Sequence, residues 1–549
     1  MQKKEKGKIA FYFVFMSAVI LVLLANGCTY VNKAKAWYET PPIMEVPEEA
    51  VRQIDVIELK EAPEEAPAED VSAEPELPEI TLSIEECRAL MLENNLDLRV
   101  QLINPSINSE SVKQEEAKFE ASFGGTAMYQ KTDTPTSTAL EGSRSETGYV
   151  SLGVDMPLRT GGTLSFDLVD NRNKTNSVWS LLNPSYTTDF SASISQPLLR
   201  NAGKRASTYS IRAARYNSKI ADVQTKLQAI NIIGNVDIAY WQLYAYRRLL
   251  DVRKQQYDYS KALYEQTERF VEVGSKPRIE LIRTKADMAG KAEAIIQAEN
   301  SVRQSERSLK RMLKKRGLGM ETKTILIPST LPDPVRYEFN REQMVKNAIE
   351  NRMEMLDLEL QLASDENYIE YLKNQALPQA TFEYKYNING LGPQRDDSYD
   401  MLTDNEFNDH RFTLSWSMPL GNKAAKSRVR KAMKDRARRL ITKENKEDEI
   451  RSDVLNRIDK VEADWQRILA NRQTTILRDE QYRAEKKQFE LGLVTSTDVL
   501  EAQANLAEAQ RMEIVAITDY QVSLINLAYS TGTLLGAAKI ELEPIEPLY

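Results

Sequence analysis

An internal duplication constrains this 549-residue chain more than any other feature of its sequence. Glu93-Asn-Asn-Leu-Asp-Leu98 opens the first copy, and Glu350-Asn-Arg-Met-Glu-Met355 opens the second. Much farther along, Gly274 precedes Gly492 by 218 positions, and Val236 precedes Val454 by the same interval. Such a fixed offset indicates one structural unit used twice rather than several unrelated domains. We predict a first repeat at 81–339 and a second at 340–536, followed by a tail at 537–549.

Each copy changes its hydrophobic period in the same order, from helical to alternating and back to helical. The first helical segments cover 83–118 and 340–376. Segments with strand-like alternation follow at about 122–198 and 380–420, and long helical hairpins at 200–316 and 422–535. The first arm of each hairpin has about 66 residues and so a predicted length of roughly 100 Å.

The alternating segments place apolar, often aromatic, residues on one face and Ser, Thr, Asp or Lys on the other. The apolar positions are Leu152, Val154, Met156, Leu164, Phe166, Leu168, Phe190, Ala192, Ile194, Phe382, Tyr384, Tyr386, Ile388, Phe412, Leu414, Trp416 and Met418. A soluble antiparallel sheet with one buried face has the same pattern. Strand lengths close to those that cross an outer membrane favour a membrane β-barrel. Long polar loops expected at 132–147, 172–187 and 389–409, which alternate with the tight turn at 159–162, favour it too.

We count four strands in the first copy, including Ser122–Lys131, and two in the second. Known membrane barrels begin at eight strands, and open sheet edges are not tolerated in lipid. The chain must therefore oligomerise to close a barrel. The helical hairpins have the period of packed helices. That period does not distinguish a solid coiled coil from a hollow cylinder.

The N-terminus predicts export from the cytoplasm. A basic stretch precedes the uncharged run Ile9–Leu24, so 1–27 is interpreted as a signal peptide, with a tilted membrane anchor as the alternative. The Gly-Cys end resembles a bacterial lipoprotein box, which makes Cys28 the candidate for lipidation. Residues 28–80 then form a lipidated N-terminus with an acidic, Pro- and Glu-rich linker, although a partner-binding tail is the other possibility.

The residue inventory excludes several classes of function. The chain has one histidine, His410, and two cysteines, Cys28 and Cys87, so metal sites with two or more histidines, zinc ribbons and iron-sulfur clusters are excluded. We find no catalytic constellation and no phosphate-binding loop, and we predict a protein that is not an enzyme and has no cofactor. The net charge of -8 disfavours a nucleic-acid binder.

A basic run follows the second strand segment: Lys423, Lys426, Arg428, Arg430, Lys431, Lys434, Arg436, Arg438 and Arg439. Its position favours a collar beside anionic lipid headgroups, with a solvated helix face as the alternative.

At the hairpin tips, Phe489-Glu-Leu-Gly492 and Val271-Glu-Val-Gly274 each end one helix at a glycine before the next begins. With the duplication and the strand ends at Pro197-Leu198 and Pro419-Leu420, these tips resemble the TolC family of outer-membrane efflux channels. The resemblance implies an α+β membrane protein: a trimeric transmembrane β-barrel, continued by a long antiparallel α-helical coiled-coil tunnel in the periplasm. It also implies an exit duct of a tripartite efflux or type I secretion system.

The resemblance further implies a homotrimer that works with a periplasmic adaptor and an inner-membrane pump. It assigns Asp498, Glu501 and Glu280 to the periplasmic gate. The alternative is an acidic residue at a helix N-terminus and a solvated glutamate, which have the same spacing. The adaptor-contact tips are expected at Val273, Gly274, Ser275, Leu491, Gly492, Leu493 and Thr495.

The family's barrel usually has twelve strands. An extra hairpin at about 148–171 implies either eighteen strands or a hairpin outside the barrel. The alternative to a channel is a lipid-anchored periplasmic coiled-coil scaffold or adaptor.

Overall fold

The computed structural model describes residues 78–137 and 142–537. These residues belong to the second of the two units into which the chain divides, Glu76–Tyr549. The predicted signal peptide, Cys28, nearly all of the acidic linker and nearly all of the C-terminal tail lie outside the described residues.

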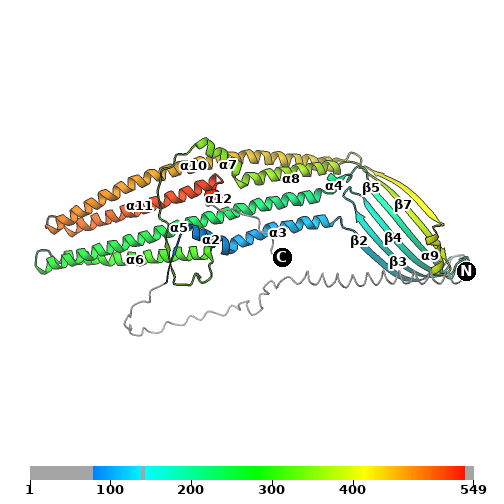
Figure 1. Ribbon diagram of the computed structural model, residues 1–549, viewed down its shortest axis with the longest axis horizontal. Helices are drawn as coiled ribbons and strands as arrows, with labels where there is room; N and C mark the ends of the chain where they lie inside the picture. The colour runs from blue at the N-terminus through cyan, green and yellow to red at the C-terminus, as the bar shows by residue number, and fades with distance from the viewer. Residues whose placement is uncertain (1–77, 138–141, 538–549) are drawn as a thin grey trace, which may run out of the picture. The chain divides into compact units, whose positions relative to one another are not determined.

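The described residues form long helices and one large sheet (Figure 1). The elements in chain order are β1 (Glu79–Leu82), α2 (Ile84–Asn94), α3 (Leu96–Ala117), β2 (Ser122–Asp133), β3 (Arg144–Pro157), β4 (Thr163–Thr175), β5 (Ser185–Pro197), α4 (Lys204–Ser207), α5 (Tyr209–Glu272), α6 (Arg278–Leu313), β6 (Ile325–Pro328), α7 (Arg341–Asn351), α8 (Met353–Gln375), β7 (Gln379–Gly392), α9 (Arg395–Asp404), β8 (Asn408–Ser417), α10 (Lys423–Glu490), α11 (Ser496–Ser530) and α12 (Leu534–Ala537).

The large sheet has six antiparallel strands in the order β2-β3-β4-β5-β7-β8. Its register is unbroken, as one row runs Phe123, Val154, Phe166, Ala192 and Tyr386 across five neighbouring strands. The six predicted strands are confirmed. The hairpin expected at about 148–171 forms β3 and β4, which pair with each other and with β2 and β5 inside this sheet.

The two faces of this sheet differ in chemistry. The face that carries Phe123 and Phe166 is apolar, and on the edge strand β8 it exposes Phe412, Leu414 and Trp416 by 65 to 70% of their surface. The opposite face carries mainly Ser, Thr, Asn and charged side chains. Exposed aromatic residues on a continuous face require another phase or another surface to cover them.

The helices lie side by side in a fixed order. Next to the sheet the contacts run α3 to α5, α5 to α8 and α8 to α10; farther away they run α6 to α5, α5 to α11 and α11 to α10. The longest helices, α5 and α10, have 64 and 68 residues, or roughly 100 Å each. Within 78–137 and 142–537, no helix has both the length and the apolar character that a membrane span needs.

The duplication is visible in the core. Val236 on α5 and Val454 on α10 are both fully buried, each in its own apolar cluster. Each cluster also buries a tyrosine whose hydroxyl meets a nearby backbone segment: Tyr240 donates to the Leu82 carbonyl at 3.2 Å, and Tyr520 donates to the Val335 carbonyl. The valines are equivalent in the two copies, whereas the tyrosines come from different elements, Tyr240 from α5 and Tyr520 from α11.

One buried ion pair joins α2 to α5. The guanidinium of Arg88 holds the carboxylate of Asp237 through two hydrogen bonds of 2.8 Å, and Asp237 is fully buried. Beside it, burial raises the pKa of the Cys87 thiol to about 12, so this cysteine remains an unreactive thiol at neutral pH.

We expect Arg88→Leu to lower the free energy of unfolding by about 3 kcal/mol, because it leaves a buried carboxylate unpaired. The double variant Arg88→Leu/Asp237→Leu should recover most of that loss. Denaturant unfolding followed by helical circular dichroism measures both. The matched control is Arg248→Leu, whose partner Asp251 is exposed; it should cost at most about 1 kcal/mol. Equal losses at the two sites would contradict the assignment.

Candidate functional site: the paired hairpin tips

Both hairpin tips are built by the same backbone motif. Gly274 and Gly492 follow α5 and α10 with φ of 75° and 78°, the left-handed region that favours glycine. The next amide in each tip bonds back toward its own helix, from Ser275 to the Phe270 carbonyl at 2.8 Å and from Leu493 to the Gln488 carbonyl at 2.9 Å. These bonds close each helix and turn the chain sharply toward α6 and α11.

The two tips pack against each other around Phe489. This ring is fully buried and meets Phe270 of the first tip edge-on, with 6.0 Å between the ring centroids. The ammonium of Lys276 lies 3.6 Å from the centroid of Phe489 and 3.4 Å from the Val494 carbonyl. A cation held over an aromatic face in this way ties the first tip to the second.

Glu280 makes a second link between the tips. Its carboxylate accepts hydrogen bonds from the Ser496 hydroxyl and from the Ser496 amide at 3.3 Å, and it pairs with Arg283 at 3.0 Å. Arg283 in turn donates to the Thr497 hydroxyl at 2.8 Å. Glu280 and Ser496 are both buried. We call the contact between Glu280 and Ser496 the tip latch.

Asp498 occupies the position of the second copy that is equivalent to Glu280 in the first, but it bonds differently. Its carboxylate accepts from the amide and hydroxyl of Thr495, at 2.8 and 2.7 Å, in a capping box. These bonds from Thr495 hold the pKa of Asp498 below its usual value. In the first copy the same cap position is Pro277, which has neither an N–H nor a hydroxyl to donate. Glu280 is therefore free to reach across to the second tip.

The structure brings some predicted site residues together and leaves others apart. Glu280 bonds to the second tip, and Asp498 to its own helix start. Glu501 is exposed, and no hydrogen bond or ion pair of its carboxylate occurs among the described residues. The sequence did not predict the roles of the latch partner Ser496 and the cation Lys276. The presence of Pro277 where the second copy has Thr495 was a signal that Glu280 and Asp498 would bond differently.

Three apolar side chains project from the tips into solvent. Val273, Leu491 and Leu493 are 76%, 67% and 72% exposed. Each flanks a tip glycine, and a side chain at Gly274 or Gly492 would meet nothing within 4 Å. The tips thus present a small apolar surface with open space around it.

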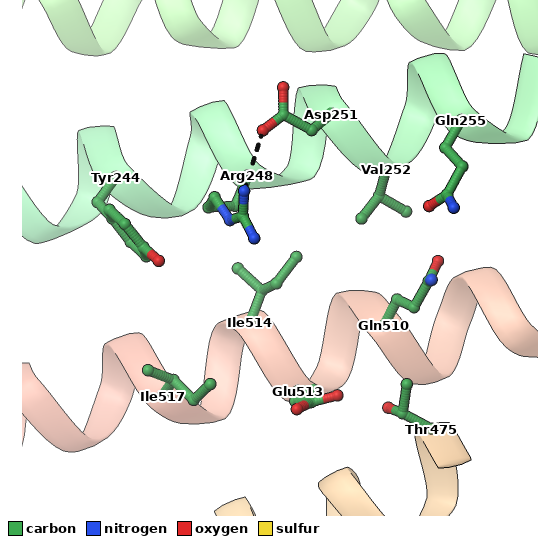
Figure 2. Close-up of a pocket in the computed structure, with 10 residues that line it drawn as sticks. All are labelled: Tyr244, Arg248, Asp251, Val252, Gln255, Thr475, Gln510, Glu513, Ile514 and Ile517. Atoms are coloured by element: carbon green, nitrogen blue, oxygen red, sulfur yellow. Dashed lines mark hydrogen bonds and ion pairs between the residues drawn. The ribbon is translucent and has the colours of Figure 1, made fainter. Parts of the chain in front are cut away.

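A hollow lies between the two hairpins above the tips, where α5 faces α11 (Figure 2). Ile514 points from α11 toward α5, opposite Arg248 and Val252, while Thr475 contributes from α10. Arg248 pairs with Asp251 of its own helix at 3.4 Å. The hollow has a volume of about 520 Å³ and is lined by polar and apolar side chains alike. The two hairpins are therefore joined at the tips and separated by a groove farther along.

Metal-ligating side chains are not gathered at the tips or elsewhere in the described part of the chain. Among residues 78–137 and 142–537, no three His, Cys, Asp or Glu side chains are grouped so that they could hold a metal ion.

A sequence model of the family "Outer membrane efflux protein" matches residues 163–313 and 344–533. The chain belongs to this family. The match begins at the first residue of β4, includes the rest of the large sheet and covers both hairpins with their tips. The TolC-type resemblance predicted from the tips and the duplication is thereby confirmed.

Solved outer-membrane channels share the fold at low sequence identity. The CmeC channel of Campylobacter jejuni superposes with a TM-score of 0.61 at 13% identity, covering 82% of this chain and 86% of that one. The channel OprN gives 0.60 at 13% identity, covering 82% and 90%. The open state of Neisseria gonorrhoeae MtrE gives 0.57 at 14% identity, covering 82% and 89%. No curated protein sequence matches the chain.

The tip latch makes a local prediction. Glu280→Ala should increase amide hydrogen exchange at 491–497, because the second tip loses its link to α6, while exchange in the middle of α5 stays unchanged. Hydrogen–deuterium exchange with mass spectrometry measures it. Glu501→Ala is the matched control and should leave these amides unaltered. Equal protection in Glu280→Ala and the native protein would show that the latch contributes nothing to the tip.

Proposed function

We propose that the protein is the outer-membrane exit duct of a tripartite efflux or type I secretion system, conducting substrates passively through a homotrimer. The observation that carries this proposal is the two-faced sheet, which exposes a continuous apolar face opposite a polar one. An aqueous conduit through lipid requires this arrangement, with apolar side chains facing outward and polar side chains facing the lumen.

The apolar face has the extent that a membrane wall requires. It runs along β3 from Met156 to Val150, which lies directly opposite Asp170 of the next strand, and Arg172 follows one row farther out on the same face. These two charged residues mark the outer limit of the apolar zone. Helix α9 covers the same end, where Arg395 pairs with Asp170 at 3.0 Å. We assign the lipid-facing band to the part of the apolar face between this limit and the strand ends near α10.

The polar face supports a wide and predominantly acidic lumen. A hollow of about 370 Å³ on this face is lined by residues that include Tyr149, Ser151, Asp167, Asp189, Ser191, Lys385, Asn387, Asp409 and Arg411. Within the described sheet the whole face carries five carboxylates, Asp155, Asp167, Asp189, Glu383 and Asp409, and two cations, Lys385 and Arg411. The difference is three negative charges per chain, which attract cations into a narrow aqueous passage.

At the other end of the hairpins, Asp498 and Glu501 are proposed to line the periplasmic gate. Both are exposed, and three copies of each around a common mouth would repel one another when the mouth closes. For Glu280 the proposal is different. Its bonds to Ser496 and Arg283 make it a tie between the tips, which must break or move if the two hairpins separate during opening.

The exposed tip residues support an adaptor contact. Val273, Leu491 and Leu493 offer apolar anchors beside the glycine turns, together with Ser275 and Thr495, and the hollow of Figure 2 lies farther along the two hairpins. A helical hairpin of a periplasmic adaptor would contact these anchors, and the adaptor would connect the duct to an inner-membrane pump. Lipidation of Cys28 would add an outer-membrane anchor.

The alternative, a lipid-anchored coiled-coil scaffold or adaptor, accounts for the long helices but leaves the sheet unexplained. A water-exposed sheet with Phe412, Leu414 and Trp416 open to solvent would be an aggregation site. We therefore favour the duct.

The experiment that tests the proposed function is conductance of the purified protein in planar lipid bilayers. We expect discrete channel openings that grow in Asp498→Ala/Glu501→Ala, because removing like charges relaxes the closed mouth. The control Glu265→Ala removes an exposed carboxylate from α5, outside the tip turn, and should leave conductance unchanged. Absence of any openings from a folded, membrane-inserted protein would contradict the proposal.

The lumen charges predict ion selectivity. Asp167→Asn/Asp409→Asn should move the reversal potential in a KCl gradient toward less cation preference, because two carboxylates of one polar row are removed per chain. Asp133→Asn, near the loop end of the opposite face, is the matched control. An identical reversal potential in all three proteins would show that the polar face does not line the passage.

The pKa of Asp498 predicts how the gate responds to acid. Because its folded pKa lies below the usual 3.8, Asp498 stays ionised, and its cap remains intact, from neutral pH down to that value. The stabilisation is lost only as the pH falls through the folded pKa. Conductance attributable to Asp498, taken as the difference from Asp498→Asn, should therefore be constant between pH 7 and 5. A midpoint within this window would contradict the assignment.

A further inference from the structure

We propose that the hollow on the polar face of the large sheet binds small zwitterions of dipeptide length, with the ammonium end at two aspartates and the carboxylate end at Lys385 and Arg411. The aspartates are Asp167 and Asp189. The inference rests on the proposed function, because it names a class of substrate for the lumen of that duct. The hollow belongs to one chain, since its lining residues lie on β3, β4, β5, β7 and β8.

The charges around this hollow are sorted by strand. Lys385 on β7 and Arg411 on β8 lie directly opposite each other in the register of the sheet. Asp167 and Asp189 come from β4 and β5, on the other side of the hollow. The buried side chain of Ser191 on β5 follows Asp167 in its row toward β7. A solute with one charge of each sign therefore meets a counter-charge at both ends.

The two cations have no carboxylate partner. Within the described part of the chain, neither Lys385 nor Arg411 forms an ion pair or a side-chain hydrogen bond. Like charges placed directly opposite on neighbouring strands destabilise a sheet. Local arrangements that cost stability are expected at functional sites. An anionic group bound between the two cations would offset their repulsion.

The aspartates near these cations are held by other contacts. Asp409, beside Arg411 on β8, accepts a hydrogen bond from the side-chain amide of Asn389 at 2.9 Å. Asp167 accepts one from the Ser191 hydroxyl at 3.5 Å. Its carboxylate also lies over Gly153 of β3, where an added Cβ atom would meet the oxygen at 2.6 Å. The glycine thus gives Asp167 room on the side of the hollow away from the cations.

The distance between the two sides fits a short zwitterion. Asp167 and Lys385 are separated by two strand spacings and by two residues along the strands, so their backbones are about 12 Å apart. The side chains at both ends shorten this gap, and an extended dipeptide separates its termini by about 7 Å. The volume of the hollow, about 370 Å³, is within the range of small-molecule sites.

The remaining lining also suits a peptide. Val169 and Tyr149 reach the polar face of β4 and β3 and offer an apolar surface to the body of the solute. The planar guanidinium of Arg411 can hold a carboxylate through two parallel hydrogen bonds. A metal ion fits less well, because the acidic side chains of the described residues are not grouped for its coordination.

The test is fluorine NMR of glycyl-para-fluorophenylalanine added to the full-length protein in lipid nanodiscs, where binding broadens the fluorine resonance. Two matched probes each keep one charge: the N-acetyl peptide has only the carboxylate, and the peptide amide has only the ammonium. We expect the zwitterion to bind at least about fivefold more tightly than either, because each analogue leaves one side of the hollow unpaired. Empty nanodiscs correct for partition into lipid.

A pair of variants assigns the binding to the hollow. Lys385→Gln/Arg411→Gln should weaken binding of the zwitterion about fivefold without weakening binding of the cationic amide. The matched control Lys131→Gln/Lys174→Gln makes the same change of charge on the opposite face of the sheet, where these lysines flank Glu146. It should leave the affinities of all three peptides unchanged.

The outcomes separate this inference from the proposed function. If the zwitterion and the amide bind native protein equally well, the lumen is only an acidic surface and the inference is overturned. The same holds if Lys385→Gln/Arg411→Gln binds the zwitterion as tightly as the native protein does. In either case channel openings of the native protein in planar bilayers leave the proposed function standing. A membrane-inserted protein that neither binds the peptide nor conducts would overturn both.

Discussion

The hydrogen bonds of the backbone impose the constraint on which the rest of this molecule depends. Every strand of the large sheet except the outermost two has its N–H and C=O groups satisfied on both sides. In lipid an unpaired backbone group costs several kcal/mol, so β2 and β8 cannot remain open in a membrane. The exposed apolar face of the sheet must be covered by lipid, and in lipid the two open edge strands must find pairing partners. Oligomerisation of the proposed duct follows from these two facts together, before any detail of the helices is considered.

The helical part shows how a duplicated unit acquires different roles from small changes. The two hairpins have the same glycine turns and the same buried valines. At the N-cap of the returning helix, however, one copy has Pro277 and the other Thr495. Thr495 donates hydrogen bonds to Asp498 of its own helix. Pro277 has no such donor, and the carboxylate of Glu280 instead bonds to Ser496 of the other hairpin. Two differences, Pro277 for Thr495 and Glu280 for Asp498, thus separate a tie between the two halves of the tip from a cap within one helix.

Much of this fold could be predicted because its signals are local and repeated. The alternation along Phe412, Leu414 and Trp416 indicates a strand with one apolar face, and the Phe-x-x-Gly pattern at Gly492 indicates where a helix ends. Other features depend on long-range contacts and left no such signal. Helix α9 lies in a stretch of polar residues that was expected to be loop, and it is held by Arg395 on Asp170, a partner from a distant strand. The latch between Glu280 and Ser496 is likewise set by how two turns pack, which periodicity does not encode.

The measurement that tests the proposed duct most directly is the environment of two neighbouring side chains on β8. Nitroxide labels at Leu414→Cys and Thr413→Cys, in protein reconstituted into lipid with Cys28→Ala and Cys87→Ala, point to opposite faces of the sheet. Electron paramagnetic resonance should find the label at 414 accessible to oxygen dissolved in the bilayer and the label at 413 accessible to a water-soluble nickel complex. If both labels contact water alone, the apolar face does not lie in lipid, and the duct is contradicted.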